Sequence, residues 1–340
     1  MSDSKFSRRD FMKVTGAGTA GFVMGGKAQD LGASQLEGDN SAPPMPERPL
    51  GKTGHNVRLF SLGGQATIEQ QGTDAESDAI INRAIDLGVN YIDTAAAYGR
   101  GISQVYVGRV MATRRDEVFL ATKTHDRTRD GSFGLLEESL KSLQTDRLDL
   151  WQMHNVRSME DLDRRFGDDG SIHALREAKE QGIVKHVGIT GHADPDVLVE
   201  GLKRFDFDTI LLALNPADKY HRPFMDNLLP LANEKGMGVI AMKIPARGRI
   251  FQEGGLTSMR EALTWTFSQP ISTVIVGCDN VAQLEENISA AVDFQPMNSA
   301  QMAAVEEKVA GYPQDASFFK TGAAGFNMPD GQEDDQQMDG

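Results

Sequence analysis

The chain has 340 residues, 39% of them hydrophobic, and no apolar run approaches the ~20 residues that a membrane-spanning helix needs. With 49 acidic against 35 basic side chains the net charge is -14, which disfavours nucleic acid and anionic membranes as partners. The single cysteine, Cys278, excludes an intramolecular disulfide, a metal site built on several thiolates and a Cys-ligated iron–sulfur cluster. The length suits one α/β barrel of about 250 residues with extensions.

Residues 1–45 are expected to form an export signal and linker. The sequence SRRDFMK at Ser7–Lys13 precedes a mildly apolar, Gly- and Ala-rich stretch, Val14–Gly26, a pattern typical of a twin-arginine export signal. It predicts a periplasmic protein whose partner during export is the twin-arginine machinery. The alternative is a disordered basic tail on a cytoplasmic protein. The polar, Pro-rich segment Ser34–Pro49 fits a linker, and the cleavage site stays open.

Residues 46–312 alternate short apolar runs with amphipathic segments, which indicates repeated βα units and a parallel sheet. Eight such units predict an α/β fold, a closed (β/α)8 TIM barrel. A Rossmann sheet is the runner-up, but no G-x-G-x-x-G follows the first strand. The predicted strands lie near Leu59–Leu62, Asn90–Asp93, Val118–Lys123, Leu148–His154, Lys185–Thr190, Thr209–Leu214, Gly238–Lys243 and Thr273–Val276.

Helices are predicted between the strands and after the last one. Asp74–Leu87 has helical apolar spacing, with Asp74 as a plausible N-cap and Gly88 as a stop. Ser299–Val309 is expected to form an extra C-terminal helix. Residues 313–340 are expected to be a partly disordered tail, and their end is acidic and Gln-rich.

Three successive predicted strands each end close to one polar residue. Asp93 ends one strand and is followed five residues later by Tyr98, Lys123 ends the next, and His154 ends the third. In a parallel barrel the carboxyl ends of neighbouring strands open on one face, where active sites lie. A phenol, an ammonium, a carboxylate and an imidazole would therefore meet there. The set predicts a proton-transfer site.

This order and spacing resembles the catalytic tetrad of the aldo-keto reductases. The likeness extends from about Leu50 to Phe294 and includes LGKTGHNVRLFSLGG, AIDLGVNYIDTAAAYG and VGCDNVAQLEEN. The resemblance implies a nicotinamide-dependent oxidoreductase, with NAD or NADP as cofactor and no metal. It would reduce an aldehyde or ketone, or oxidise the alcohol or sugar. It also implies an N-terminal β-hairpin that closes the bottom of the barrel.

The resemblance assigns a role to each member of the tetrad. Tyr98 would protonate the carbonyl oxygen, Asp93 would hold Lys123, and His154 would orient the substrate. A free tyrosine has a pKa near ~10, and a neighbouring ammonium favours phenolate. We therefore expect Lys123 to lower the pKa of Tyr98.

The resemblance also places the cofactor at the end of the barrel sequence. The loop and helix after the eighth strand would hold the nucleotide, with Asn287 near adenine and Gln283 beside the adenosine. Thr190 keeps the hydroxyl of the Ser-Asn pair that normally holds the nicotinamide. The residues implied for cofactor binding are Thr190, Asn215, Gly277, Cys278, Asp279, Gln283 and Asn287.

This region departs from the family pattern in two ways. The Asn, Gln and aromatic positions around the nicotinamide are Gly191, Leu211 and Met242, so Asn215 or Lys243 could take over part of that role. No basic residue lies between Val276 and Asn287, and Asp279 would repel a 2′-phosphate. NADP selectivity is therefore in doubt, unless an arginine after the seventh strand, Arg247 or Arg249, supplies the charge.

The substrate is expected to be a small carbonyl or sugar-like compound bound by the loops on the carboxyl-end face. Two alternatives stay open. One is a cofactor-binding regulatory barrel with little turnover. The other is a sugar isomerase or epimerase, which would normally need a metal cluster or an unrelated acid–base pair.

Overall fold

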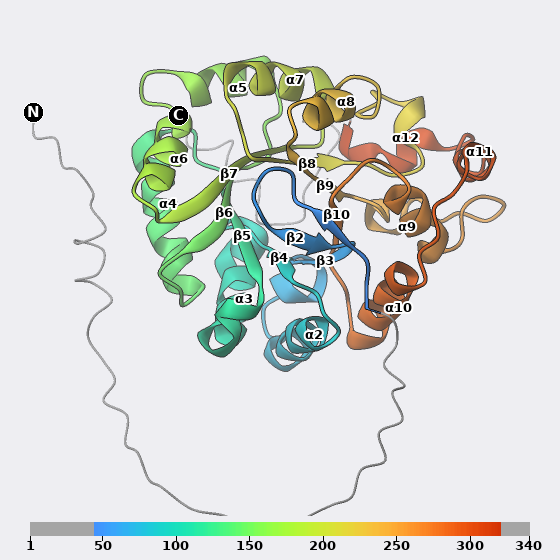
Figure 1. Ribbon diagram of the computed structural model, residues 1–340, viewed down its shortest axis with the longest axis horizontal. Coiled ribbons are helices and arrows are strands. Elements are labelled where there is room, and N and C mark those ends of the chain that lie inside the picture. The colour runs from blue at the N-terminus through green and yellow to red at the C-terminus, as the bar shows by residue number, and fades with distance from the viewer. Residues whose placement is uncertain (1–43, 321–340) are drawn as a thin grey trace, which may run out of the picture. The chain divides into compact units, whose positions relative to one another are not determined.

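In the computed structural model, which describes residues 44–320, eight parallel strands form a closed barrel with helices around it (Figure 1). The strand order around the barrel is β10-β3-β4-β5-β6-β7-β8-β9. The strands are β3 (Phe60–Gly63), β4 (Tyr91–Asp93), β5 (Phe119–Thr124), β6 (Leu148–Met153), β7 (Val184–Gly191), β8 (Thr209–Ala213), β9 (Gly238–Met242) and β10 (Thr273–Val276).

The predicted (β/α)8 barrel is confirmed and the Rossmann alternative is wrong. Every predicted strand is present, with ends that agree to about one residue because a buried parallel strand is a short, nearly continuous apolar run. The helices of the described part are α2 (Asp74–Asp86), α3 (Ile102–Arg114), α4 (Arg129–Ser142), α5 (Met159–Phe166), α6 (Ser171–Glu180), α7 (Pro195–Arg204), α8 (Leu228–Glu234), α9 (Met259–Phe267), α10 (Val281–Val292), α11 (Ser299–Glu307) and α12 (Pro313–Ala316).

Helix α2 begins one residue earlier than its predicted cap implies. Thr73 holds the N-cap position, and Asp74 is the first helical residue, where it accepts a hydrogen bond from the Tyr106 hydroxyl at 3.1 Å. Asp74 also pairs with Arg109, so its carboxylate is used between helices rather than as a cap. Gly88 has φ +89°, which confirms it as the C-terminal stop because glycine adopts left-handed backbone without strain.

The predicted N-terminal hairpin is present. Strands β1 (Glu47–Pro49) and β2 (Asn56–Arg58) pair antiparallel. Leu50 and Val57 are fully buried in the same apolar cluster as the barrel-interior side chains Tyr91, Phe119 and Leu150. The hairpin therefore closes the amino-terminal end of the barrel with apolar side chains.

Inward-facing positions change from apolar to polar along the strands. In β4 the order is Tyr91 then Asp93, and in β5 it is Phe119, Ala121 and then Lys123. Because side chains alternate along a strand, these residues share the interior face. The amino-terminal part of the barrel is thus packed core, while the carboxyl end carries chemical groups.

The last described residues pack on the barrel. Within the expected tail, α12 and the 3₁₀ turn Phe318–Lys320 are ordered, and Phe318, Phe319 and Lys320 are buried. Lys320 forms a buried ion pair with Asp218 and donates to the carbonyl of His221 at 3.0 Å. This pair fastens the segment beside the carboxyl ends of the strands.

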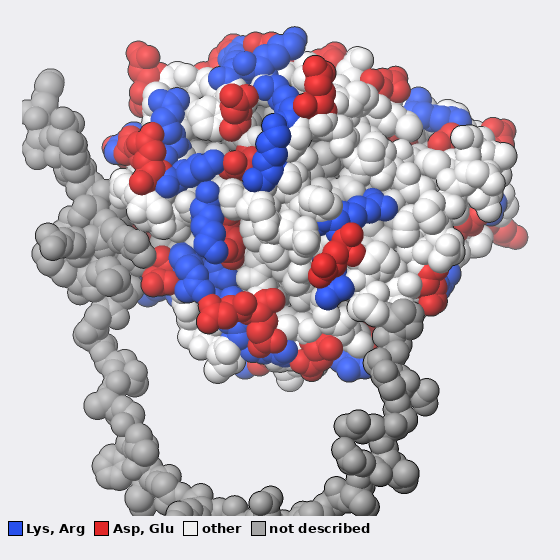
Figure 2. Space-filling model, in the orientation of Figure 1, with Lys and Arg blue, Asp and Glu red and all other residues white. Residues whose placement is uncertain are grey.

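The surface of the described part carries charges of both signs. Lys and Arg side chains lie among Asp and Glu on the face shown in Figure 2. Within residues 44–320, no helix is long and apolar enough to cross a membrane. The predicted signal in residues 1–43 and the acidic C-terminal end both lie outside the described residues.

Candidate active site

The structure brings the four predicted catalytic residues together. Asp93 is the last residue of β4, Tyr98 begins the 3₁₀ turn Tyr98–Gly101, Lys123 lies in β5 and His154 follows β6. These strands are neighbours in the barrel, and all four side chains are buried. Sequence-distant groups therefore meet because consecutive parallel strands end on the same face.

Lys123 lies at the centre of this group. Its ammonium pairs with the Asp93 carboxylate, donates to the carbonyl oxygen of Thr94 at 2.8 Å, and lies 3.2 Å from the Tyr98 hydroxyl. Its side chain is 1% exposed and that of Asp93 is 0% exposed. A buried ammonium needs such partners, because an uncompensated charge is costly away from water.

A second residue holds the carboxylate from the other side. Gln152 Nε2 donates to Asp93 Oδ2 at 3.0 Å, and Gln152 pairs in register with Lys123 between β5 and β6. Sequence reasoning missed this residue. Alternation within β6 could have found it, because Gln152 lies between two inward-facing positions, Leu150 and His154.

The ionisation of Tyr98 differs from the expectation. Burial raises the pKa of Tyr98 well above its ordinary value, and the Asp93 and Glu69 carboxylates raise it further. The net shift of the Tyr98 pKa in the unliganded site is therefore upward, so the lowering expected from Lys123 does not prevail there. Because Asp93 compensates the positive charge of Lys123, burial has a larger effect on the pKa of Tyr98 than the cation has. Tyr98 is consequently a protonated phenol at neutral pH.

His154 is neutral at the same pH. Burial lowers the pKa of His154 well below its ordinary value, and the positive charge of Lys123 lowers it further. Its ring meets that of Tyr98 edge-on, with centroids 5.6 Å apart and an angle of 79°. A neutral imidazole beside a protonated phenol can donate a hydrogen bond to an oxygen without adding charge to the site.

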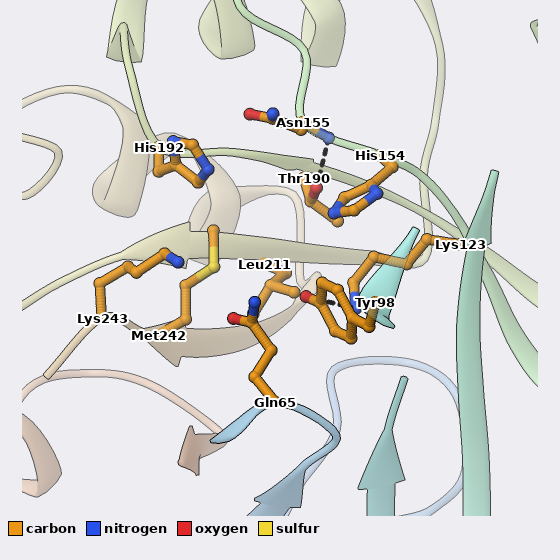
Figure 3. Close-up of a pocket in the computed structure, with 10 residues that line it drawn as sticks. All are labelled: Gln65, Tyr98, Lys123, His154, Asn155, Thr190, His192, Leu211, Met242 and Lys243. Atoms are coloured by element: carbon orange, nitrogen blue, oxygen red, sulfur yellow. Dashed lines mark hydrogen bonds between the residues drawn. The ribbon is translucent and has the colours of Figure 1, made fainter. Parts of the chain in front are cut away.

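Tyr98, Lys123 and His154 line one pocket (Figure 3). Thr190, Leu211 and Met242, from β7, β8 and β9, contribute a hydroxyl and two apolar side chains. The remaining lining residues come from the loops after strands and are Gln65, Asn155, His192 and Lys243.

His192 is part of this pocket rather than a surface histidine. It is 8% exposed and its ring meets that of Phe319 edge-on, with centroids 6.3 Å apart. The sequence places His192 just after the fifth barrel strand, on this face, but does not indicate its burial. The burial comes from the C-terminal segment, whose position no local sequence pattern indicates.

Comparison with known proteins identifies the family. The profile of the Aldo/keto reductase family matches residues 59–254. The chain belongs to this family. It is therefore an NAD(P)-dependent oxidoreductase that acts on carbonyl compounds or the corresponding alcohols.

Related sequences and a solved structure agree with this membership. An uncharacterised oxidoreductase of Bacillus subtilis, YqkF, is 29% identical over 296 residues, covering 73% of this chain and 91% of that protein. L-galactose dehydrogenase of Arabidopsis thaliana is 27% identical over 295 residues, covering 75% of this chain and 90% of that protein. The holo form of aldo-keto reductase AKR11C1 from Bacillus halodurans superposes with a TM-score of 0.66 at 24% identity, covering 77% of this chain and 96% of that one. This last likeness concerns the fold.

The residues expected at the cofactor of this aldo-keto reductase lie in two places. Thr190 lines the pocket, where its hydroxyl accepts a hydrogen bond from the backbone of Asn155 at 2.8 Å. Asn215 does not line it. The Asn215 amide instead donates to the carbonyls of Lys243 at 3.1 Å and Ala316 at 2.9 Å, so it braces the backbone beside the pocket.

The other expected residues surround the start of α10. Gln283 accepts a hydrogen bond from the backbone of Asp279 at 2.6 Å, and Asn280 caps the helix by accepting from Gln283 N at 2.9 Å. Asn287 is buried and donates to the Cys278 sulfur at 3.6 Å. Burial raises the pKa of Cys278 to about 12, so its thiol is a packing group rather than a nucleophile.

These surroundings fit a nicotinamide dinucleotide. Leu211 and Met242 offer apolar contact to a flat ring, and Thr190 offers a hydroxyl. The N-terminus of the 12-residue helix α10 could offer backbone amides to an anionic group of the cofactor. Within residues 44–320 no cluster of three or more His, Cys, Asp or Glu side chains could hold a metal ion.

Proposed function

We propose that this enzyme reduces the carbonyl of a small aldehyde or ketone, or oxidises the corresponding alcohol or sugar, with Asp93, Tyr98, Lys123 and His154 as its reaction centre. The observation that carries the proposal is the position of Lys123. Its ammonium is fixed by the Asp93 carboxylate and lies 3.2 Å from the Tyr98 hydroxyl. An ammonium in this position stabilises the phenolate that remains when Tyr98 gives up its proton.

Each residue has a defined task in the reductive direction. A reduced nicotinamide, when bound, would supply the hydride for the carbonyl carbon. Tyr98 is protonated at neutral pH and gives its proton to the carbonyl oxygen. His154 is neutral and donates a hydrogen bond that orients this oxygen. Asp93 and Gln152 keep the Lys123 ammonium in place. In the oxidative direction the phenolate of Tyr98 accepts the proton again.

The cofactor would be held by Thr190 in the pocket and by the segment that leads into α10. Gly277, Cys278 and Asp279 form the turn after β10, and Gln283 and Asn287 lie on α10. Only backbone amides and neutral or acidic side chains come from this segment. This composition supports use of NAD at least as well as NADP.

A sugar-like substrate suits both the pocket and the relatives. L-galactose dehydrogenase of Arabidopsis thaliana and 6-dehydroglucose reductase of Novosphingobium aromaticivorans, which is 25% identical over 283 residues, carry sugar activities in their names. The pocket of this enzyme is rich in polar groups, including Gln65, Asn155 and His192, which can bind hydroxyl groups.

A substrate panel tests the proposed function. Purified protein is supplied with NADH or NADPH and a series of aldoses, simple aldehydes and ketones, and with NAD or NADP and the corresponding sugars. The change in absorbance of the reduced nicotinamide reports turnover. Turnover with at least one carbonyl or sugar supports the proposal, while binding of the nicotinamide without turnover of any member would favour a regulatory barrel.

We further propose that the protein is exported in folded form to the periplasm. The motif SRRDFMK at Ser7–Lys13 and the mildly apolar stretch that follows support this. Folded export would allow the cofactor to be loaded in the cytoplasm, where nicotinamide is available. A periplasmic enzyme would then have to hold the cofactor tightly and recycle it between two substrates.

A further inference from the structure

Lys243 has an unusual position at the carboxyl end of β9. It is the first residue after the strand, and its backbone is left-handed with φ +65°, a conformation that non-glycine residues seldom adopt. Its carbonyl oxygen accepts hydrogen bonds from Asn215 Nδ2 and from Ala246 N, both at 3.1 Å. The surrounding structure thus fixes a strained backbone at a residue of the pocket.

The side chain of Lys243 extends into the pocket from the side opposite Tyr98 (Figure 3). Its ammonium makes no hydrogen bond or ion pair with any residue of the range 44–320. The two fully buried lysines differ in this respect, because Lys123 is paired with Asp93 and Lys320 with Asp218. Among the described residues, Lys243 is therefore a cation at the pocket without a carboxylate within ion-pair distance.

The charges that face Lys243 do not compensate it. Arg247, from the same loop, and Lys123, from β5, both oppose its positive charge, while Glu69 from the turn after β3 favours it. Burial, with the two cations, lowers the pKa of Lys243 to about 8. The positive charge of Lys243 in turn lowers the pKa of His192 in the same pocket. At neutral pH Lys243 is still mostly protonated.

We propose that Lys243 is the anion-binding residue of the pocket and takes an anionic oxygen of the bound ligand. An ammonium that is partly buried, opposed by neighbouring cations and without a hydrogen-bond acceptor is stabilised when an anion arrives. Two ligands could bring this oxygen, namely the pyrophosphate of the dinucleotide or a carboxylate on the carbonyl substrate. The inference rests on the proposed function, because both ligands take part in the proposed reaction.

Binding measurements on unreacted ligands test the inference without turnover. ADP-ribose carries the pyrophosphate and adenosine does not, and both can be titrated calorimetrically against native protein and Lys243→Met. If the pyrophosphate is the partner, Lys243→Met lowers the affinity for ADP-ribose at least about tenfold, as expected for loss of a charged hydrogen bond. The affinity for adenosine should stay unchanged.

The carboxylate arm uses two aldehydes that differ in charge. Succinic semialdehyde carries a carboxylate and pentanal does not. If the substrate carboxylate is the partner, Lys243→Met raises KM for succinic semialdehyde at least about tenfold relative to pentanal, while ADP-ribose binding is unchanged. Succinic semialdehyde is also titrated directly against protein lacking cofactor.

Two further variants separate a binding role from a structural one. Lys203→Met on α7 makes the same change at an exposed lysine and should leave all affinities unchanged. Lys243→Arg keeps the charge and should retain binding. Native protein should lose affinity for the anion as the pH rises through about 8, and this loss should be absent from Lys243→Arg. If Lys243→Met is folded and binds ADP-ribose and succinic semialdehyde like native protein, the inference is overturned. If Tyr98→Phe retained full turnover while Lys243→Met lost anion binding, the proposed tetrad would fail and this inference would stand.

Discussion

The Tyr98 hydroxyl lies 3.2 Å from the Lys123 ammonium, yet the phenol keeps a raised pKa. The two facts are consistent, because Lys123 is already paired with Asp93 and Tyr98 is buried. In the resting site the phenol is therefore an intact acid. The ammonium acts on it mainly when the proton leaves and a phenolate forms beside it.

Replacing Lys123 by Met should lower turnover by about 10²–10³, the usual effect of removing one group that stabilises developing charge. It should also move the alkaline limb of the reductive pH–rate profile to higher pH, because the phenolate of Tyr98 loses the cation beside it. The profile of kcat/KM measures both effects.

The control for this experiment concerns the partner carboxylate. Lys123→Met leaves Asp93 buried without its cation, so a double variant with Asp93→Asn removes both charges together. An alkaline limb that stays in place in both variants would show that another group tunes Tyr98.

The pH dependence of His154 provides an independent prediction. A lowered pKa means that the imidazole is neutral above that pKa and gains a proton only well below its ordinary range. Reduction should therefore show no inflection near pH ~6.5, the ordinary value for histidine. We expect a flat kcat/KM between about pH 6 and 8, with a lower rate but the same flat profile in His154→Gln. An inflection near 6.5 in native protein that disappears in His154→Gln would contradict the neutral assignment.

Cofactor preference should be mixed or tilted toward NAD(H). No Lys or Arg lies between Val276 and Asn287, and Asp279 would repel a 2′-phosphate bound at this segment. Fluorescence titration with NADH and NADPH measures the ratio of dissociation constants. A preference for NADPH above about a hundredfold, or about 2.7 kcal/mol, would be incompatible with this prediction. Arg247→Met and Arg249→Met would then identify the residue that binds the phosphate.

Export can be tested by replacing Arg8 and Arg9 with Lys and fractionating cells. The native protein should reach the periplasm and the Lys-Lys form should stay in the cytoplasm, because the twin-arginine receptor reads the arginine pair. Equal distribution of the two forms would contradict export. Protein purified from the periplasm without added cofactor should carry bound nicotinamide, and its absence would contradict cofactor loading before export.

Much of the fold could be predicted because its signals are local. Short apolar runs predicted every barrel strand, and three polar residues at or just after strand ends, together with Tyr98, predicted a cluster that the structure assembles. The pairing of Lys123 with Asp93 also followed, since each needs a partner when buried.

What could not be predicted depends on tertiary packing. The raised pKa of Tyr98 follows from how fully the site is buried, which spacing does not indicate. The burial of His192 depends on Phe319, which lies more than a hundred residues later in the chain. Asn215 holds the backbone beside the pocket by donating a hydrogen bond to the carbonyl of Ala316. These contacts come from a C-terminal segment that reads as a tail in the sequence.

The most direct test of the account is the turnover of Tyr98→Phe with a carbonyl substrate that native protein reduces. Loss of the acid should lower kcat by about 10²–10⁴ and leave nicotinamide binding nearly unchanged. Tyr106→Phe removes a hydroxyl outside the pocket, which accepts a hydrogen bond from Gly72 N at 3.0 Å. This control variant should keep near-native turnover. Near-native kcat in a folded Tyr98→Phe protein would contradict the assignment of Tyr98 as the proton donor.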